Sequence, residues 1–354
     1  MNLRDFGYND ELERFIIANG LRDFGVGRIV SEQKEQYLVL TEAGEIRAEI
    51  TGNLRFAAKG REDFPAVGDW VCLLTADPDF SLIQQILPRY SIISRRAVGK
   101  FGEIQIIATN IDFALLLQAV DRDFNLNRLE RYLTICHSSG VKPIIVLTKT
   151  DLASEGAVAE LIATISQRVD HAPVVAISNR SRDGYGALRE LIAKGKTYCL
   201  LGSSGVGKST LLNNLSGRDL MRTDDISQSS HKGRHVTSHR ELIVLDNGGM
   251  LIDNPGMREV GVTARDEGLE TTFSAIFSHA PHCKFQDCTH ANETGCAVIA
   301  ALNRGEIDAK QYESYLKLTR EKAHFDSSMA ERRKKDKDFG KMLKSYKKER
   351  KAGR

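Results

Sequence analysis

Eight consecutive residues near the middle of the chain have the types and spacing that bind a nucleotide phosphate. They are GSSGVGKS, from Gly202 to Ser209, and they match G-x-x-x-x-G-K-[ST]. The apolar run YCLL precedes them and the helical pattern TLLNNLSG follows, which is the strand–loop–helix context that phosphate binding needs. This context favours a phosphate-binding loop, here called the P-loop, over a glycine-rich turn without function.

The P-loop residues have separate predicted parts. The glycines let backbone N–H groups wrap the β-phosphate, and the positive end of the following helix favours the anion. Lys208 would reach the β- and γ-phosphates, and Ser209 would offer its hydroxyl to Mg²⁺. The predicted nucleotide contacts in this stretch are Gly202, Ser203, Ser204, Gly205, Val206, Gly207, Lys208, Ser209 and Thr210.

A shorter motif indicates which base is bound. T-K-T-D, from Thr148 to Asp151, follows the apolar run PIIVL and resembles the [N/T]-K-x-D loop with which GTPases bind guanine. Asp151 would accept the guanine N1–H and N2–H₂ bonds that adenine cannot offer, and Lys149 would lie along the base plane. Thr150 completes the motif, and Ser178, in VVAIS, would stand near the guanine O6.

Two segments after the P-loop contain candidate partners of the γ-phosphate. DNPG matches D-x-x-G, so Asp253 would hold Mg²⁺ through water and the N–H of Gly256 would face the γ-phosphate. The polar stretch SQSSHKGRHVTSHR lies between, and Thr237 within it is the predicted sensor of Mg²⁺ and γ-phosphate.

The residue that places the attacking water does not follow the usual pattern. Many small GTPases have a glutamine after D-x-x-G, but this chain has Met257, whose thioether accepts only weakly. His235 is the best catalytic candidate, together with Lys208 and Thr237, because a neutral imidazole can accept a proton or hold water. The alternative is a surface histidine without a catalytic part.

The base motifs precede the P-loop, whereas in an ordinary GTPase they follow it. In a parallel α/β sheet, however, packing decides which strands are neighbours, and chain order does not. If the ends of a GTPase were joined and new ends cut elsewhere, the base motifs would come first and still lie beside the P-loop. The order base, base, phosphate, switch, switch therefore predicts a circularly permuted GTPase.

Thiols and an imidazole near residue 290 predict a structural metal site. CKFQDCTHANETGC places Cys283, Cys288, His290 and Cys296 in the pattern C-x4-C-x-H-x5-C. Three thiolates and one imidazole at these spacings suit a closed tetrahedral zinc site. The alternative, reduced surface cysteines without metal, does not explain the spacing.

The patterns around these motifs predict three kinds of structure. From about residue 25 to 96, five short runs separated by turn formers predict a small closed barrel, for which the oligonucleotide-binding barrel is one candidate. From about residue 105 to 263, apolar runs alternate with helical patterns, which predicts a parallel sheet covered on both faces. Helical patterns alone follow. Four aromatic residues of the barrel region could stack on bases, although core is the better interpretation of each: Tyr37, Phe56, Phe64 and Trp70.

Bulk composition excludes several classes of protein. The longest apolar runs are too short to cross a bilayer, and the N-terminus lacks the apolar core of a secretion signal, so we expect a cytoplasmic monomer without membrane contact. The net charge is +3, yet residues 331–354 contain twelve Lys or Arg against four Asp or Glu. Such a tail indicates an anionic partner such as nucleic acid, with a solvated helix end as an equal alternative.

The motifs together resemble those of the circularly permuted ribosome-biogenesis GTPases known as ribosome small subunit-dependent GTPase A. The resemblance covers nearly the whole chain and rests on TKTD, GSSGVGKST, KGRHVTSHREL, DNPGMRE and the cysteine cluster. It implies an N-terminal OB-fold β-barrel that binds RNA, a central circularly permuted P-loop α/β GTPase domain and a C-terminal α-helical zinc-binding domain. We expect the ranges 1–104, with an extension at 1–24, then 105–264, and 265–354 with the basic tail.

The same resemblance implies binding of GTP and GDP with Mg²⁺, and GTP hydrolysis stimulated by the small (30S) ribosomal subunit. It also implies contact with the rRNA and a role in late maturation of that subunit. This chain departs from the family at Thr148, where asparagine is more frequent, and at Val236 and Ser238, which flank the single remaining threonine. We expect Thr148 to support the base loop less well, while Asp151 still enforces guanine.

Two other functions stay open at this point. An RNA-binding assembly factor could use the nucleotide only as a structural switch, and turnover in the presence of small subunits would distinguish it from an enzyme. A P-loop kinase would need a second substrate pocket and a lid, for which the sequence gives no signal.

Overall fold

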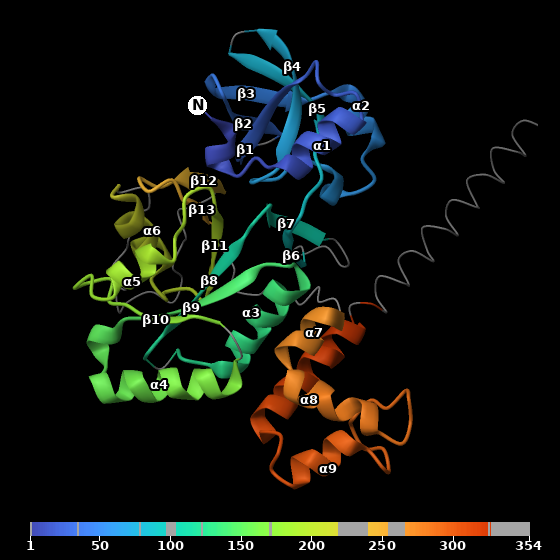
Figure 1. The fold of residues 1–354 in the computed structure, drawn as a ribbon, viewed down its shortest axis with the longest axis vertical. Helices are drawn as coiled ribbons and strands as arrows, with labels where there is room; N and C mark the ends of the chain where they lie inside the picture. The colour runs from blue at the N-terminus through green and yellow to red at the C-terminus, as the bar shows by residue number, and fades with distance from the viewer. Residues whose placement is uncertain are drawn as a thin grey trace, which may run out of the picture.

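The computed structural model describes residues 2–33, 35–77, 79–96, 104–121, 123–169, 172–218, 240–253, 266–324 and 326. A barrel with a helical N-terminal segment, an α/β part and a helical part follow one another along the chain (Figure 1). This architecture confirms the predicted fold class. Among these described residues, no helix combines the length and apolar character needed to cross a membrane.

Five strands form the barrel and correspond to the five predicted runs. They are β1 (Gly25–Gln33), β2 (Gln36–Thr41), β3 (Gly44–Ile50), β4 (Trp70–Asp77) and β5 (Phe80–Ile86). The strands pair in the order β1-β2-β3-β5-β4, and β4 pairs again with β1, which closes the barrel. The β3–β5 pair is parallel and the other pairs are antiparallel. A short helix, α2 (Gly52–Ala57), follows β3, and the 3₁₀ turn η2 (Arg61–Asp63) precedes β4.

The N-terminal segment packs onto the barrel. It contains the 3₁₀ turn η1 (Leu3–Phe6) and the helix α1 (Asp10–Ala18). Leu12 and Ile16, on the buried face of α1, share one core cluster with Trp70. The extension, whose place the sequence left open, therefore contributes to the hydrophobic core of this part.

Burial separates the four aromatic residues that were candidates for stacking. Trp70 and Tyr37 are core residues, 0% and 2% exposed. Phe64 is half-buried against the barrel core. Phe56, on α2, is 94% exposed, so the core interpretation is wrong for this residue and holds for Trp70 and Tyr37.

A six-stranded sheet forms the centre of the α/β part. Its strands are β8 (Phe113–Ala119), β9 (Lys142–Thr148), β10 (Val174–Ala176), β11 (Thr197–Gly202), β12 (Glu241–Val244) and β13 (Met250–Asp253). Their order is β10-β9-β8-β11-β13-β12, and only the last pair among them is antiparallel. The strand that leads into the P-loop, β11, lies between β8 and β13, although β8, β9 and β10 precede it in the chain. This is the arrangement that circular permutation predicts.

Helices cover both faces of this sheet. They are α3 (Leu126–Ser138), α4 (Glu155–Arg168), α5 (Tyr185–Glu190) and α6 (Lys208–Ser216). Side chains alternate along β8: Leu116 packs in the cluster that contains residues of α3 and α4, whereas Leu115 and Leu117 pack in the cluster of α5 and α6. Burial on both faces explains why the strand reads as one continuous apolar run.

Two connections join the barrel to the α/β part. Ser31 of β1 pairs with Glu241 of β12, so barrel and central sheet form one eleven-stranded sheet. A separate antiparallel ribbon of β6 (Ile92–Arg96) and β7 (Ile104–Thr109) lies between the two parts in sequence. The patterns had not predicted this ribbon.

Arg28 is buried where the barrel meets the α/β part. Its guanidinium donates to the carbonyl oxygens of Phe6, Gly68 and Asn110 and to the hydroxyl of Thr197, at 2.6–3.2 Å. Burial lowers the pKa of Arg28, but its donors are satisfied by groups from the N-terminal segment, the barrel, the turn between β7 and β8, and β11. The residue therefore fastens four segments at one point.

The C-terminal part is helical and packs on α3. It contains α7 (Asp266–Thr272), α8 (Ser274–His279), the 3₁₀ turn η4 (Ala280–His282), α9 (Ala297–Asn303) and helical residues 309–324. A Cβ on Gly268 of α7 would come 1.9 Å from Oγ of Ser138, so this close approach to α3 requires glycine. His137 of α3 and Thr272 of α7 add a hydrogen bond of 2.9 Å between Nδ1 and Oγ1.

Candidate functional site

The P-loop joins β11 to α6 at the carboxyl end of the parallel strands. Gly205 and Gly207 have φ values of 77° and 97°, in the left-handed region that favours glycine. Nζ of Lys208 donates to the carbonyl oxygens of Gly202 and Ser203 at 2.8 and 2.6 Å, so the lysine lies along the loop. The first turn of α6 contains Lys208, Ser209 and Thr210, and the N-terminal end of a helix, with its backbone N–H groups, suits an anion.

Two loops from the neighbouring strands β9 and β10 meet beside the P-loop. We call residues 148–151 the first base loop and residues 178–183 the second base loop. The Ser178 hydroxyl donates to Oδ1 of Asp151 at 2.7 Å, which joins the two loops. The Thr148 hydroxyl donates to the carbonyl oxygen of Val206 at 2.8 Å, which attaches the first base loop to the P-loop. The structure thus brings the base motifs and the P-loop together, while their contacts with a nucleotide stay predictions.

Lys149 has a partner that the sequence did not indicate. Its backbone is left-handed, with φ of 61°, and its Nζ donates to Oδ2 of Asp121 at 2.9 Å. Burial alone would raise the pKa of Asp121, but the hydrogen bond from Lys149 and the backbone bonds lower it, so the carboxylate stays charged. Nearby, Asp123 accepts from the Ser203 hydroxyl and pairs with Arg128 at 2.9 Å. These two aspartates follow β8, and the run DRDF at a strand end was the signal that could have indicated them.

Of the predicted switch residues, the structure describes Asp253. Asp253 ends β13 and is 5% exposed. Since β13 runs parallel to β11, the Asp253 carboxylate lies at the same edge of the sheet as the P-loop. His235, Thr237 and Gly256 lie outside the described residues, so their parts in Mg²⁺ binding and hydrolysis stay predictions.

Cys283, Cys288, His290 and Cys296 form a cluster that could hold a metal ion. Their ligand atoms all lie within 4.8 Å of one another. The Sγ atoms of Cys283 and Cys296 are 3.8 Å apart, and Nδ1 of His290 is 3.5 and 3.6 Å from them. With Zn–S near 2.3 Å and Zn–N near 2.0 Å, a tetrahedral site has edges of about 3.8 Å and about 3.5 Å. The donor set and its spacing therefore fit a tetrahedral zinc ion.

The surrounding residues hold the cluster in shape. His290 has a left-handed φ of 59°, and its carbonyl oxygen accepts from the Tyr312 hydroxyl at 2.6 Å. Cys296 caps α9, since its Sγ accepts from the N–H of Ile299 at 3.4 Å. Burial opposes ionisation of Cys283, but N–H groups at the start of α9 outweigh it and lower the pKa of this thiol. Thiolate is the form that binds metal.

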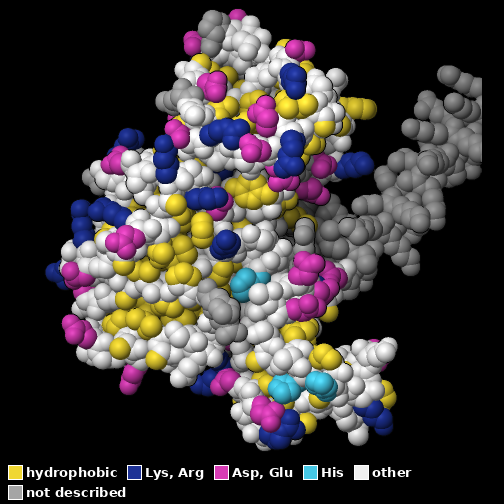
Figure 2. Space-filling model, in the orientation of Figure 1, with side chains coloured by type: hydrophobic (Ala, Val, Ile, Leu, Met, Phe, Trp, Pro, Cys, Tyr) yellow, Lys and Arg dark blue, Asp and Glu magenta, His cyan; other side chains and the backbone are white. Residues whose placement is uncertain are grey.

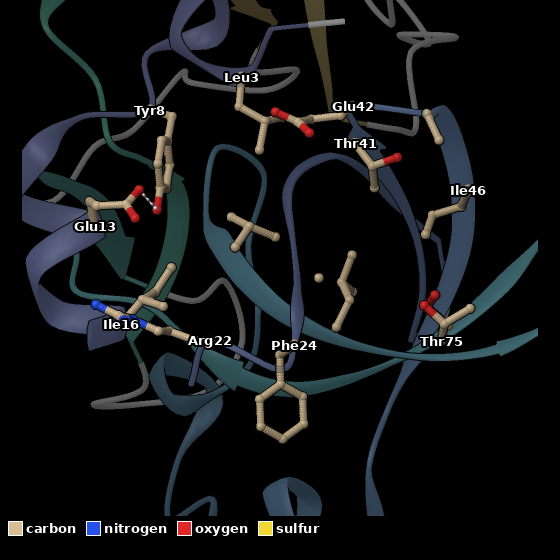
Figure 3. A pocket seen from close by; sticks show the side chains of 15 residues that line it. Leu3, Tyr8, Glu13, Ile16, Arg22, Phe24, Thr41, Glu42, Ile46 and Thr75 are labelled. Atoms are coloured by element: carbon tan, nitrogen blue, oxygen red, sulfur yellow. Dashed lines mark hydrogen bonds between the residues drawn. The ribbon is translucent and has the colours of Figure 1, made fainter. Parts of the chain in front are cut away.

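Surface charge and one cavity of the described residues can be compared with these two sites. On the face shown in Figure 2, Lys and Arg side chains are interspersed with Asp and Glu over the barrel and the α/β part. The basic tail, residues 331–354, lies outside the described residues. A cavity of about 560 Å³ lies between the N-terminal segment and the barrel, where Tyr8 donates to Glu13 at 2.9 Å (Figure 3). None of the residues predicted to contact nucleotide or metal lines it.

Two family models match this chain. The model described as RsgA GTPase matches residues 86–263, which contain both base loops, the P-loop and Asp253. A model described as ABC transporter matches residues 187–347, a range that includes the P-loop. A P-loop between a strand and a helix is common to many nucleotide-binding proteins, so this second match adds no base or substrate.

Relatives and solved structures match over most of the chain. A Bacteroides thetaiotaomicron protein named small ribosomal subunit biogenesis GTPase RsgA 1 is 39% identical over 348 residues, 98% of this chain and 97% of that protein. A Methanosarcina acetivorans protein named small ribosomal subunit biogenesis GTPase RsgA is 43% identical over 92% of this chain and 86% of its own length.

Two crystal structures have a similar fold. YjeQ from Thermotoga maritima is similar with a TM-score of 0.64 and 24% identity, over 84% of this chain and 98% of its own. YloQ, described as a circularly permuted GTPase, is similar with a TM-score of 0.62 and 26% identity, over 85% of this chain and 96% of its own.

Proposed function

The chain belongs to the RsgA GTPase family, whose members are GTP hydrolases, and from this premise we propose that it hydrolyses GTP on the small ribosomal subunit during late maturation. One observation carries the proposal: about 40% identity to proteins named for small ribosomal subunit biogenesis extends over nearly the whole chain. It therefore includes the barrel and the metal cluster as well as the nucleotide site. We assign the domains to residues 1–104, 105–264 and 265–354.

The proposed nucleotide site uses the geometry at the edge of the sheet. Asp151, held by Ser178, accepts the guanine N1–H and N2–H₂ groups, while Lys149 lies beside the base. Lys208 and the P-loop N–H groups hold the β- and γ-phosphates. Ser209 and Thr237 would hold Mg²⁺ directly and Asp253 would hold it through water, while the N–H of Gly256 would face the γ-phosphate. These groups position GTP and stabilise the charge of its phosphates, and we expect these two effects to supply most of the catalysis.

The proposed metal is one structural zinc ion, held by three thiolates and the His290 imidazole. With four protein ligands such a site has no open position for substrate. Its part is to stabilise the helical domain, where the three cysteines belong to one core cluster with Val298 and Tyr315. The ring of His290 lies 6.5 Å from that of Tyr315, measured between centroids. The barrel and the basic tail are the proposed contacts with rRNA. The barrel has five strands like an oligonucleotide-binding barrel, and the tail is rich in Lys and Arg.

Hydrolysis is expected to be slow in the isolated protein and fast on its partner. Met257 cannot orient water as glutamine does, so docking on the small subunit would bring His235 to the γ-phosphate. The test compares GTP turnover with and without purified small subunits for the intact protein, His235→Ala and, as a matched control in the same stretch, His231→Ala.

We expect subunits to raise the rate of the intact protein and of His231→Ala. His235→Ala should bind GTP within about twofold of the intact protein and lose about 100-fold of the stimulated rate, the usual size of a general base or water-placing contribution. Full stimulation of His235→Ala would remove His235 from the mechanism. No stimulation of the intact protein would favour a nucleotide-switched assembly factor instead.

A further inference from the structure

The second base loop contacts the P-loop through a residue that the motif analysis did not single out. Asn179 follows Ser178, and its Nδ2 donates to the carbonyl oxygen of Gly207 at 3.0 Å. The same oxygen accepts the first intrahelical bond of α6 from the N–H of Leu211 at 2.9 Å. Asn179 therefore ties the second base loop to the point where the P-loop becomes α6.

Two neighbours hold the Asn179 side chain. The Tyr185 hydroxyl, on α5, donates to Oδ1 of Asn179 at 2.8 Å. Nδ2 of Asn214, on α6, donates to the Tyr185 oxygen at 2.9 Å and to the backbone oxygen of Asn179 at 3.1 Å. Tyr185 is 3% exposed, so its hydroxyl has few alternatives in water. The loop, α5 and α6 thus form one chain of hydrogen bonds.

The donor and acceptor roles in this series of hydrogen bonds follow from the groups at its two ends. Both ends are backbone carbonyl oxygens, those of Asn179 and Gly207, and a carbonyl oxygen only accepts. Asn214 must therefore present its NH₂ group, which leaves the single Tyr185 proton for Oδ1 of Asn179. The NH₂ group of Asn179 must then face Gly207. Reversal of the Asn179 amide would place two oxygens against each other and leave the Tyr185 proton without its acceptor.

We propose that Asn179 is a positioning residue that sets the distance between the guanine-binding loops and the P-loop, and so couples base recognition to phosphate binding. The proposal rests on the proposed function, which places a guanine nucleotide in this site. Thr148 bonds to the Val206 carbonyl oxygen and Asn179 to that of Gly207, so two adjacent P-loop peptides hold both base loops.

The coupling follows from the shape of the ligand. A nucleotide spans base and phosphate sites, so its base reaches Asp151 only when the loops stand at the right distance from the P-loop. Ser178 precedes Asn179 and bonds to Asp151 at 2.7 Å, hence a shift of Asn179 moves the carboxylate that selects guanine. Hydrogen bonds of this kind tolerate displacements of only about 0.5 Å before affinity falls.

The test measures equilibrium binding of GDP and of inosine diphosphate to the full-length protein without ribosomal subunits. Inosine lacks the 2-amino group, so the GDP-to-IDP affinity ratio reports the contact with Asp151. Asn179→Asp keeps the shape but loses the donor and puts a second oxygen against Gly207. We expect it to weaken GDP binding at least about 30-fold, Asn179→Ala about tenfold and Tyr185→Phe about threefold.

In all three variants the GDP-to-IDP ratio should fall toward one. Arg180→Ala is the matched control, because it removes an exposed side chain of the same loop and should keep both affinities. In Asn179→Asp the introduced carboxyl regains a donor when it is protonated, so its affinity relative to the intact protein should recover as the pH falls toward about 5. A variant that has merely lost its fold would not recover.

The outcomes separate the two proposals. If the intact protein binds GDP and Asn179→Asp binds it equally well with an unchanged GDP-to-IDP ratio, the positioning role of Asn179 is overturned and the proposed function stands. If the intact protein does not bind GDP, the guanine assignment of the site is overturned, and the inference with it.

Discussion

The Thr148 hydroxyl makes the contact that fastens the first base loop. It donates to the carbonyl oxygen of Val206 at 2.8 Å, and the side chain is fully buried. We had expected threonine to support this loop less well than the asparagine that is more frequent in the family. One donor is sufficient for this bond, however, and a hydroxyl supplies it as an amide would.

Removal of that hydroxyl gives a direct measure of its contribution. Thr148→Val keeps the shape and leaves the Val206 oxygen without this donor, which should weaken GDP binding about fivefold, equivalent to about 1 kcal/mol. Thr148→Asn should bind within about twofold of the intact protein. Thr164→Val, which removes a similar hydroxyl on the exposed face of α4, is the control. Fluorescence titration with GDP measures the affinity of each variant. Unchanged affinity in Thr148→Val would show that the bond is dispensable.

Residues that act by holding other residues in place are harder to predict from sequence than the motifs. The P-loop, T-K-T-D and the cysteine cluster could be predicted because their spacing reflects one local geometry. Asn179, Asp121 and Asp123 belong to no motif, and each acts through a partner brought near by the fold. The run DRDF at a strand end could have indicated the two aspartates, but the partners of all three residues depend on which strands are neighbours.

Among the elements, the cysteine cluster joins several segments of the helical part. It links the loop from Cys283 to Cys296 with the start of α9 and, through the His290 carbonyl oxygen, with Tyr312 in the helical residues 309–324. The part has one small core cluster of its own. A metal ion that binds only the folded site would therefore supply much of its folding free energy.

Loss of one ligand should release the metal and loosen this part alone. Cys296→Ser is expected to lower the zinc content from one ion per chain to near zero. It should also lower the free energy of unfolding of the helical part by several kcal/mol. GDP binding should persist, because the base loops and the P-loop belong to the α/β part. Elemental analysis and limited proteolysis would measure this, with His282→Ala as a control that should retain zinc. Absence of zinc from the intact protein would contradict the assignment.

The interface between α3 and the helical part contains a buried carboxyl. Glu130 of α3 is 1% exposed, and Nη1 of Arg168 lies 3.8 Å from its Oε1. Burial raises the pKa of Glu130, while the Ser314 side chain and Arg168 partly oppose the rise. In the unfolded chain the carboxyl loses its proton near pH 4.3, before the folded form does. Stability therefore falls as the pH rises from that value through the folded pKa.

Glu130→Gln should consequently be more stable than the intact protein at pH 7, because the amide keeps the shape without the buried charge. The difference should shrink toward zero near pH 3, where Glu130 is protonated in both states. Thermal unfolding at the two pH values measures it, and Glu160→Gln on the exposed side of α4 is the control. A Glu130→Gln variant that is less stable than the intact protein at pH 7 would show that the pairing with Arg168 outweighs the burial.

At the scale of the whole molecule, the three parts could be predicted but their attachment could not. Apolar runs of strand length indicated the barrel and the parallel sheet, because burial on one or both faces leaves a repeated pattern. The Ser31–Glu241 pairing depends on residues that are distant in the chain. The β6–β7 ribbon is a local pair, but its two runs lie at the boundary between the barrel pattern and the α/β pattern and were not predicted as strands. The buried Arg28 had no signal at all, since a lone arginine in a strand is usually exposed.

Arg28 provides a test of how the barrel and the α/β part are joined. Arg28→Met keeps the apolar stem but removes the guanidinium donor from the Phe6 oxygen and the Thr197 hydroxyl. The oxygens of Gly68 and Asn110 lose one of two donors, since Asn110 Nδ2 and the Tyr90 hydroxyl also bond to them. The free energy of unfolding should fall by about 3 kcal/mol. Urea titration followed in both parts should show the barrel unfolding ahead of the α/β part. Arg22→Met, an exposed position just before β1, should behave as the intact protein. Unchanged unfolding of Arg28→Met would show that other contacts hold the junction.

The position of β11 inside the sheet also sets the order in which a ribosome can complete this protein. The strand β8 ends at Ala119, yet its second neighbour is complete only at Gly202. At about 5–20 residues per second, roughly 4–17 seconds of synthesis separate the two. β9 and β10, on one side of β8, are synthesised within that interval, whereas the backbone groups on the other side of β8 gain their partner only with β11. In an ordinary GTPase the strand before the P-loop is made early. In this permuted chain the corresponding strand, β11, is made after β8, β9 and β10 and must then pair with the free edge of β8.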